Sequence, residues 1–279
     1  ALRRKRVLRN RIIAGGVLLA FIILIILLIV IISNASKRKE EPVETTEETT
    51  EEVTKAPLEG FTVLLDAGHG FNDFGAQCEV NGSWEKEYTI SVILMLRDKL
   101  ENLGASVLLT HDGKSYTKET EILEQAEKLK ITEKYPELQL DTEEDDNLDK
   151  YERVALANIW HETKGFDLFL SLHFDSSQYE DESGMSVYYC EDNPHVSELG
   201  SLAVKLCSSV KSSGLHDNTF TYRTAYDDSY VVVKYCDYPA ILIEGGYLTN
   251  ESDTEKIADD EWQEKFAAQL AVALADYFS

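Results

Sequence analysis

Three side chains that can bind a metal ion or transfer a proton each follow a strand-like segment. His69 follows the apolar run TVLLD, His173 follows LFLSL, and Glu244 follows AILI. In open α/β sheets ligands bind beyond the carboxyl ends of the strands, so we expect these side chains to meet at one site. A single histidine at a strand end is more often structural than a ligand, and it is the matched placement that favours a shared site.

Two imidazoles and a carboxylate with an open fourth position form the ligand set of a catalytic zinc site, where the metal lowers the pKa of bound water to about 7. Glu85 opens a predicted helix and could supply the carboxylate, but Glu87 lies in the same turn, and either could only interact with the helix dipole. Glu244 would then accept a proton from the water and return it to a leaving group. The next two residues, Gly245 and Gly246, would let the backbone approach the substrate.

The elements that must position these residues alternate between strand-like and helix-like patterns, which is typical of a layered α/β fold. The predicted strands are 61–70, 105–112, 167–175, 185–190 and 239–244. The predicted helices are 85–104, 117–135, 151–163, 193–214 and one that includes residues 262–277.

The residues before this domain have the composition of a membrane anchor and a linker. Residues 1–11 are rich in Arg, and 12–32 carry no charged side chain and could cross a hydrocarbon core of about 30 Å as a helix. A cleaved signal peptide would have a shorter apolar region. Residues 33–59 include a Glu/Thr-rich stretch that cannot form a core. The basic flank predicts a single-pass protein with its N-terminus in the cytoplasm and residues 60–279 outside it.

The charge and the cysteines exclude several kinds of ligand. The chain carries 51 acidic and 27 basic residues, a formal net charge of −24, which argues against nucleic acid or anionic lipid as the ligand of the outer domain. The cysteine spacing resembles no metal-binding knuckle and predicts no particular disulfide. The four cysteines are Cys78, Cys190, Cys207 and Cys236.

The chain resembles the zinc-dependent N-acetylmuramoyl-L-alanine amidase family (amidase type 3 catalytic domain) through five motifs in order: VLLDAGHGFNDFGA, EKEYTI, ERVALAN, LFLSLHFD and AILIEGGYLTNESD. The resemblance runs from about Phe61 to the C-terminus and implies a three-layer α/β/α sandwich with a mostly parallel, twisted sheet. It implies that His69, Glu85 and His173 bind one Zn²⁺ and that Glu244 is catalytic. The implied reaction is hydrolysis of the amide between N-acetylmuramic acid and the L-alanine of the stem peptide in bacterial peptidoglycan.

The chain departs from the family pattern near the predicted site. Asp175 stands where the family commonly has asparagine, and its charge could weaken binding of an acidic substrate. His111 and Asp112, followed by an insertion, replace the family's Arg-x-x-Asp pattern. Arg153, in ERVALAN, could bind a substrate carboxylate or tie its helix to an acidic neighbour. Arg153 and Asp175 are therefore candidates for substrate binding.

The insertion at 113–150 combines a predicted charged helix, with Ile122, Ala126 and Leu129 on one side, and an acidic loop. A carboxylate of this loop could occupy the open metal position, in which case a protein activator would relieve the restraint. A solvated surface insertion is the alternative. The Tyr-rich segment 220–235 could line a glycan groove or form ordinary strand and loop surface.

Two other functions fit the same motifs. One is a catalytically silent peptidoglycan-binding scaffold of a division or sporulation complex, and the other is a zinc peptidase that cuts within the stem peptide. A binding protein has no need of a buried base, so Glu244 argues against the scaffold. The identity of the products would separate the amidase from the peptidase.

Overall fold

The computed structural model describes residues 55–78, 80–138, 140, 148–224 and 230–279. They belong to one of two compact units of the chain, Thr54–Ser279. The predicted basic tail (1–11), anchor (12–32) and most of the linker (33–59) lie outside the described residues. None of the helices in the described ranges is both long enough and apolar enough to span a membrane.

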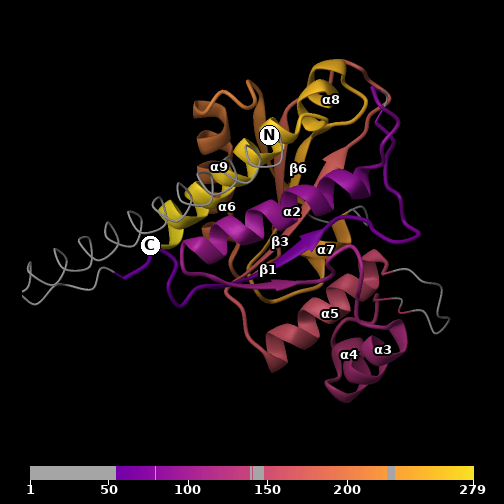
Figure 1. Cartoon of the computed structure of the whole chain (residues 1–279). Coiled ribbons are helices and arrows are strands. Elements are labelled where there is room, and N and C mark those ends of the chain that lie inside the picture. Colours follow the sequence, from indigo (N-terminus) through magenta and orange to yellow (C-terminus); the bar gives the residue numbers. More distant parts are fainter. Residues whose placement is uncertain (1–54, 79, 139, 141–147, 225–229) are drawn as a thin grey trace, which may run out of the picture. The chain divides into compact units, whose positions relative to one another are not determined.

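A six-stranded mixed sheet forms the centre of the described unit, with the strand order β2-β1-β3-β6-β4-β5 (Figure 1). Neighbouring strands are parallel except β4 and β6, which pair antiparallel. Because β1, β3 and β6 run in the same direction, their carboxyl ends meet at one edge of the sheet. The strands are β1 (Thr62–Ala67), β2 (Ser106–Leu109), β3 (Leu168–Asp175), β4 (Met185–Cys190), β5 (Thr219–Thr224) and β6 (Ala240–Tyr247).

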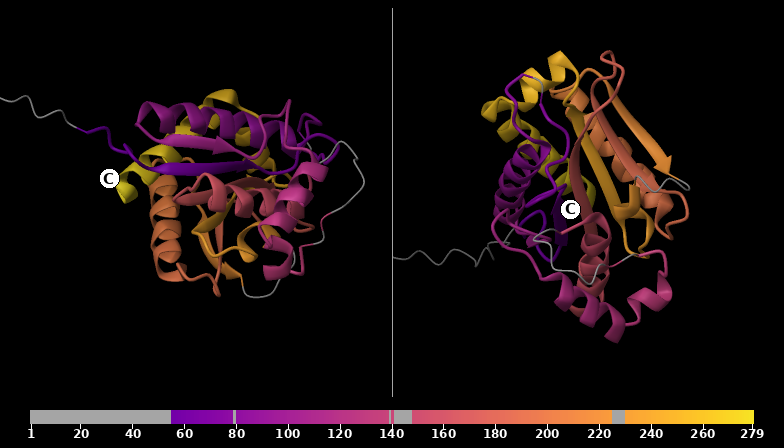
Figure 2. Two further views of the ribbon diagram at one scale, coloured as in Figure 1. Left: turned by 90° about the horizontal axis from the view of Figure 1, so that it is seen from below. Right: turned by 90° about the vertical axis from the view of Figure 1, so that its right-hand side faces the viewer.

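Helices cover both faces of the sheet, which makes the unit a three-layer α/β/α sandwich (Figures 1 and 2). Each face has its own apolar core, and the strands that lie between the two cores are buried on both sides. One face carries α2 (Glu85–Asn102), α6 (Val196–Ser212), α8 (Glu251–Ile257) and α9 (Asp260–Phe278). The other carries α3 (Glu119–Lys128), α4 (Ile131–Lys134), α5 (Lys150–Thr163) and α7 (Val231–Lys234).

The described part of the insertion is a packed layer and not a solvated decoration. Ile122 and Ala126 of α3 are buried in the same apolar core as α5. The predicted single helix over 117–135 is broken at Lys130, whose φ of 60° is left-handed and separates α3 from α4. The acidic residues 141–147 lie outside the described residues, so a restraint by this loop on the metal site stays a prediction.

Three elements were not predicted from the sequence: β5, α7 and α8. Strand β5 lies at the edge of the sheet and its side chains are mostly exposed, and its sequence TFTYRT lacks the apolar run that marks a buried strand. Helices α7 and α8 are too short for a periodic pattern. The four cysteines are free and buried.

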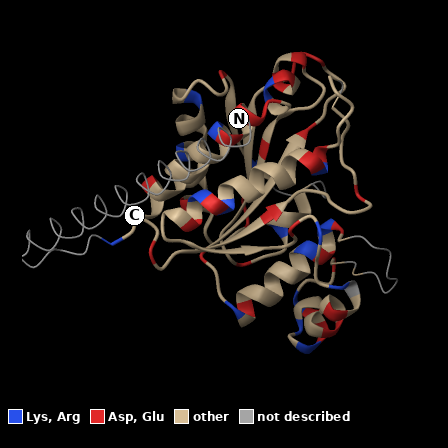
Figure 3. Ribbon diagram, viewed as in Figure 1, with Lys and Arg blue, Asp and Glu red and all other residues tan. Residues whose placement is uncertain are grey.

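Acidic residues occur on helices of both faces of the sheet (Figure 3). A few described charged side chains are fully buried, and burial of a charge is costly unless it is paired. The buried Asp, Glu and Arg residues are Asp66, Glu85, Glu152, Arg153 and Asp253.

Asp66 and Arg153 form a buried pair that joins β1, α5, β3 and the residue that follows β2. Asp66, on β1, accepts hydrogen bonds of 2.7 Å from the hydroxyl groups of Thr110 and Ser171. Arg153, on α5, places Nη1 3.8 Å from Asp66 Oδ2 and donates to the carbonyl oxygen of Ala67 at 3.0 Å. Burial alone would raise the pKa of Asp66, but Arg153 and the two hydroxyl groups outweigh it and lower the pKa.

We expect the Asp66→Asn substitution to lower the free energy of unfolding at pH 7 by about 3–5 kcal/mol, because it leaves the Arg153 charge buried without its partner. The lowered pKa of Asp66 means that its contribution is present above the unfolded-state pKa of about 3.9 and is lost as the pH falls through the folded-state value. Urea unfolding of the full-length chain at pH 7 and pH 3 measures the loss of unfolding free energy and its dependence on pH.

The control is Asp98→Asn, which removes an exposed partner of Arg97 and should change the free energy of unfolding by less than about 1 kcal/mol. The difference between the parent and Asp66→Asn should shrink at pH 3. An equal loss at both pH values would contradict a role for the Asp66 charge.

Candidate metal centre

A sharp turn after β1 aims the His69 side chain at the carboxyl edge of the sheet. The backbone of His69 has a φ of 63° and that of Phe71 a φ of 51°, both in the left-handed region that non-glycine residues rarely adopt. The turn is closed by paired backbone hydrogen bonds of 2.9 Å between Gly70 and Asp73. It brings Asp73 Oδ2 to 2.8 Å from Nδ1 of His69, which leaves Nε2 directed at the first turn of α2.

The two glutamates in the first turn of α2, which the sequence did not distinguish as metal ligands, have different surroundings. Glu87 turns back on its own helix and accepts the Trp84 backbone N–H at 3.0 Å, so it serves as a cap. Glu85 turns inward and is buried. Its two carboxylate oxygens accept the backbone N–H groups of Ala76 (3.0 Å) and Phe174 (3.1 Å), which fix the carboxylate at the edge of the sheet.

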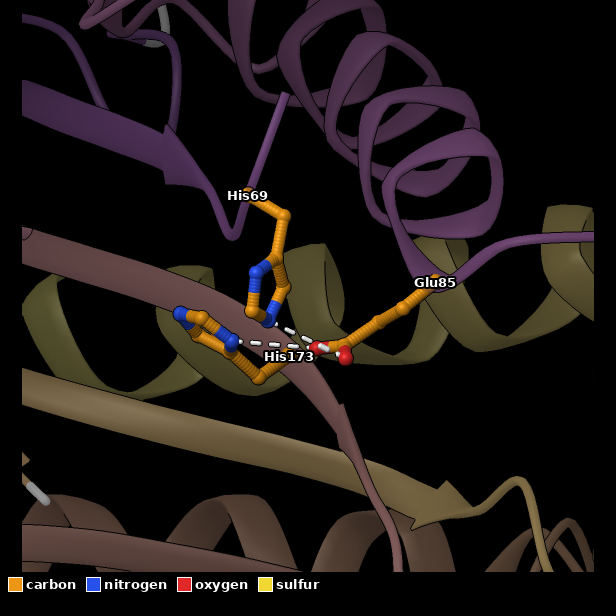
Figure 4. A group of neighbouring side chains, drawn as sticks. All are labelled: His69, Glu85 and His173. Atoms are coloured by element: carbon orange, nitrogen blue, oxygen red, sulfur yellow. Dashed lines mark hydrogen bonds and ion pairs between the residues drawn. The ribbon is translucent and has the colours of Figure 1, made fainter. Parts of the chain in front are cut away.

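His69, Glu85 and His173 form one cluster at this edge (Figure 4). Nε2 of His69 lies 3.0 Å from Glu85 Oε2, and Nδ1 of His173 lies 3.0 Å from Glu85 Oε1. The two imidazole rings meet edge to face with their centroids 4.9 Å apart. One donor atom from each residue lies within 4.8 Å of the others, so the three can face a common point.

The surroundings of the cluster fit a small cation. A Cβ atom at Gly75 would lie 2.6 Å from Glu85 Oε2 and 2.7 Å from His69 Cδ2, and one at Gly68 would overlap the His173 ring. Glycine is therefore required on two sides of the cluster. Two imidazole nitrogens and one carboxylate oxygen are donors that Zn²⁺ accepts in catalytic sites, although other divalent ions share them.

Asp73 contacts the cluster without being one of its three members, and only its spacing of four residues from His69 could have indicated this contact in the sequence. Burial lowers the pKa of His69, but the carboxylates of Asp73 and Glu85 outweigh burial and raise the pKa to about 9. Burial likewise raises the pKa of Glu85, and hydrogen bonds with His173 and His69 outweigh it and lower the pKa. A carboxylate on the far nitrogen of a metal-binding histidine fixes the ring orientation and its tautomer.

A cavity of about 360 Å³ opens beside the cluster, lined in part by His69, His173, Leu242 and Glu244. Glu244 lies on β6 directly opposite His173 on β3. Its Oε2 atom is buried and has no hydrogen-bond partner among the described residues. Burial, together with the negative charges of Asp175 and Glu85, raises the pKa of Glu244 well above its usual value.

Arg153 and Asp175, the two candidates for substrate binding, lie in different surroundings. Arg153 contributes to the cavity wall, but it is only 2% exposed and its guanidinium contacts Asp66 and the Ala67 carbonyl, as expected of a structural role. Asp175 is not among the residues that line the cavity. Its Oδ1 accepts the Ser176 backbone N–H at 2.7 Å, and its charge acts on Glu244 from the end of β3.

The predicted role of the glycines after Glu244 is wrong. A Cβ atom at Gly245 would lie 2.7 Å from Cε1 of Phe174 and 3.2 Å from Cε1 of Phe266, in the apolar core on the face opposite the cavity. Gly246 has a φ of 145° and is surrounded by protein atoms as well. These glycines permit close packing inside the protein, and they do not open the backbone to a substrate.

Comparison with known proteins gives a consistent result. The family model described as N-acetylmuramoyl-L-alanine amidase matches residues 63–276. The chain is 29% identical over 226 residues to the probable cell wall amidase LytH of Staphylococcus aureus, a match that covers 81% of this chain and 61% of LytH. The chain therefore spans less than two thirds of the length of this curated relative.

Solved structures share the fold. The CwlD amidase from Clostridioides difficile, solved in complex with the GerS lipoprotein, has a TM-score of 0.57 and 24% identity, and the match covers 78% of this chain and 98% of that chain. The amidase AmiC2 of Nostoc punctiforme has a TM-score of 0.57 and 22% identity, with 78% and 96% covered. At these identities the likeness establishes the α/β/α architecture.

We expect Asp73→Asn to weaken zinc binding by about 10- to 100-fold, because it removes the charged group that orients His69. The measurement is a chelator competition with the full-length chain, with the exposed substitution Asp260→Asn as the control. His173→Ala should reduce the affinity further by removing a donor atom. An Asp73→Asn protein that binds zinc like the parent would rule out this role.

Proposed function

Because the chain belongs to the N-acetylmuramoyl-L-alanine amidase family, we propose that its folded unit hydrolyses the amide between N-acetylmuramic acid and the L-alanine of the stem peptide of peptidoglycan. The name of the curated relative LytH, a probable cell wall amidase, supports this substrate class. The single observation that carries the proposal is the meeting of His69, Glu85 and His173 beside a cavity that also contains Glu244.

In this proposal His69, Glu85 and His173 hold one zinc ion. Bound zinc would supply Lewis acidity, which lowers the pKa of water and stabilises negative charge on an amide oxygen. The Asp73 carboxylate contacts Nδ1 of His69, so that Nε2 points at the cluster. The backbone N–H groups of Ala76 and Phe174 hold the Glu85 carboxylate in place before any ligand arrives.

Glu244 transfers the proton. Its unpartnered Oε2 faces no competing donor among the described residues, so it is free to take a proton from the attacking water and to return it to the leaving amine nitrogen. Burial and the nearby charges of Asp175 and Glu85 raise the pKa of Glu244, which makes its carboxylate a stronger proton acceptor. The same arrangement supports an enzyme over a silent scaffold, since a binding surface gains nothing from an isolated buried carboxyl group.

Arg153 and Asp175 remain proposals as substrate-binding residues. Arg153 lies at the cavity wall, and its Nε atom has no hydrogen-bond partner among the described residues, so a substrate carbonyl or carboxylate could accept from it. Asp175 would disfavour an acidic group at the end of β3 by charge repulsion.

We expect Glu244→Gln to slow hydrolysis by about 10²- to 10⁴-fold while zinc content stays unchanged, because the substitution removes the proton acceptor and no metal ligand. The assay incubates the zinc-loaded full-length chain with purified peptidoglycan and detects stem peptides with a free N-terminal alanine by mass spectrometry. Glu251→Gln, on the exposed start of α8, is the control.

The products also test the rival functions. Stem peptides cut between amino acids would identify a zinc peptidase. A parent that binds zinc and peptidoglycan but releases nothing would overturn the amidase proposal in favour of a scaffold. Full activity in Glu244→Gln would exclude Glu244 as the base.

We also propose that residues 12–32 anchor the protein in the bacterial cell membrane, with residues 60–279 on the outer side, where peptidoglycan lies. The support is the apolar run and its basic N-terminal flank. A protein activator acting on the 113–150 insertion belongs to the same proposal, and the complex of the related CwlD with the GerS lipoprotein is a precedent for a partner.

An epitope placed after Ser279 should be accessible to antibody on intact spheroplasts, whereas one placed before Ala1 should become accessible only after lysis. The two tagged chains serve as each other's control. The opposite pattern would reverse the proposed orientation, and loss of the chain from the membrane fraction would exclude the anchor.

A further inference from the structure

Four aromatic side chains form a stacked row that runs from residues next to the cavity wall to the edge of the sheet. The ring centroids are 4.3 Å apart for Tyr230 and Tyr188, 5.1 Å for Tyr188 and Tyr222, and 6.2 Å for Tyr222 and Phe220, with planes within 27° of parallel. Tyr188 is buried, whereas Tyr222 and Phe220 are 44% and 43% exposed. We call these four side chains the aromatic shelf.

The aromatic shelf lies on the same face of the sheet as the cavity. In the strand register Tyr222 is opposite Tyr188, and Tyr188 is opposite Leu242, which lines the cavity. Residues directly opposite one another on neighbouring strands share a face. At the inner end of the shelf, Tyr230 immediately precedes Val231, another residue of the cavity wall. The inner end of the shelf therefore lies next to the cavity wall on the same face of the sheet.

A second row of the sheet connects the exposed end of the shelf to Glu244. Phe220 is opposite Ser186, and Ser186 is opposite Glu244, so two strand spacings of about 4.8 Å separate Phe220 from Glu244. Ser186 is 1% exposed, and its hydroxyl has no hydrogen-bond partner among the described residues. The row therefore places Phe220 two strands from Glu244, while Ser186 itself is covered by protein.

The exposed rings stand on β5, the edge strand of the sheet, seen at the rim in the right-hand view of Figure 2. Edge strands are usually protected by charged side chains, but here the cavity face of the edge presents Phe220 and Tyr222. Flat aromatic faces carry negative electrostatic potential and attract C–H groups, such as those on the face of a pyranose ring. The surface suits an uncharged ring better than an anion, in line with the acidic chain.

We propose that the aromatic shelf binds the glycan strand of peptidoglycan, with N-acetylhexosamine rings against Tyr222 and Phe220 while the amide of the stem peptide enters the cavity beside Glu244. The inference rests on the proposed amidase function, because that function places a glycan next to the cavity. Continuity with the cavity favours a substrate over a second copy of the chain or a protein that pairs with β5.

The test compares the zinc-loaded full-length parent with the double variant Phe220→Leu and Tyr222→Leu, which keeps apolar side chains on β5 but removes the flat rings. Val204→Thr with Val272→Thr, which removes two exposed apolar side chains from α6 and α9 in the other layer, is the control. The probes are glycan strands freed of stem peptides, intact peptidoglycan, and a muramoyl peptide with a single sugar.

The double variant should bind the peptide-free glycan about tenfold more weakly and show a similar rise in KM for intact peptidoglycan. Its kcat on peptidoglycan and its rate on the muramoyl peptide should match the parent, because the shelf contacts are the same in the ground state and the transition state. The control pair should behave like the parent in every assay.

Three results would overturn the proposal: unchanged affinity for the peptide-free glycan, an equal loss on the muramoyl peptide, or a change in oligomeric state with unchanged glycan binding. The last would identify β5 as an interface between copies. Failure of the proposed function is distinct from these. A parent that binds the glycan through the shelf but cleaves neither substrate would refute the amidase activity and leave the shelf as a glycan-binding site.

Discussion

The Glu85 carboxylate is the contact on which the arrangement of the site depends. It meets His69 from the turn after β1 and His173 from β3, while backbone N–H groups of Ala76 and Phe174 hold its two oxygens. One side chain at the start of α2 thus joins a loop, a strand and a helix at the carboxyl edge of the sheet. Gly68 and Gly75 contact the cluster so closely that a side chain at either position would overlap His173, His69 or Glu85.

Alternate side chains along the strands face either an apolar core or the cavity. On β3 and β6, Phe174 and Gly245 face the core that contains α2 and α9, whereas His173 and Glu244 face the cavity. A one-residue shift in strand register would exchange these sets. Extended across β4 to β5, the same alternation places the aromatic shelf on the cavity face, so the sheet itself links the cavity to the surface at its edge.

The buried carboxylates of Asp66 and Glu85 are paired, whereas Glu244, a partly exposed residue with a buried Oε2 atom, differs from them. Asp66 is stabilised by Arg153 and two hydroxyl groups, and Glu85 by two imidazoles, so both keep a lowered pKa despite burial. The Oε2 atom of Glu244 has no such partner among the described residues, and its pKa is raised. A carboxyl group with an unpartnered oxygen beside paired ones marks the position where a proton can be exchanged.

The sequence by itself determined the α/β alternation, the buried strands and the residues that follow them, because runs such as LFLSLHFD and AILIEGG carry a local signal that tertiary contacts do not alter. It predicted β4 at its observed bounds, Met185–Cys190, for the same reason. It did not assign β5, because the segment TFTYRT has no apolar run. The prediction for Gly245 was wrong because the surroundings of a strand residue depend on packing partners far along the chain.

Only the tertiary structure shows that Glu85 joins the cluster while Glu87 caps its own helix. The contacts of Asp73 with His69 and of Arg153 with Asp66 also depend on the fold. The tertiary structure also brings together the rings of the aromatic shelf. Each of these depends on distances and directions between side chains on different elements, which spacing along one segment does not specify. The sequence therefore fixes which groups are available for chemistry, and the folded chain decides which of them meet, because only the packing of the elements sets those distances.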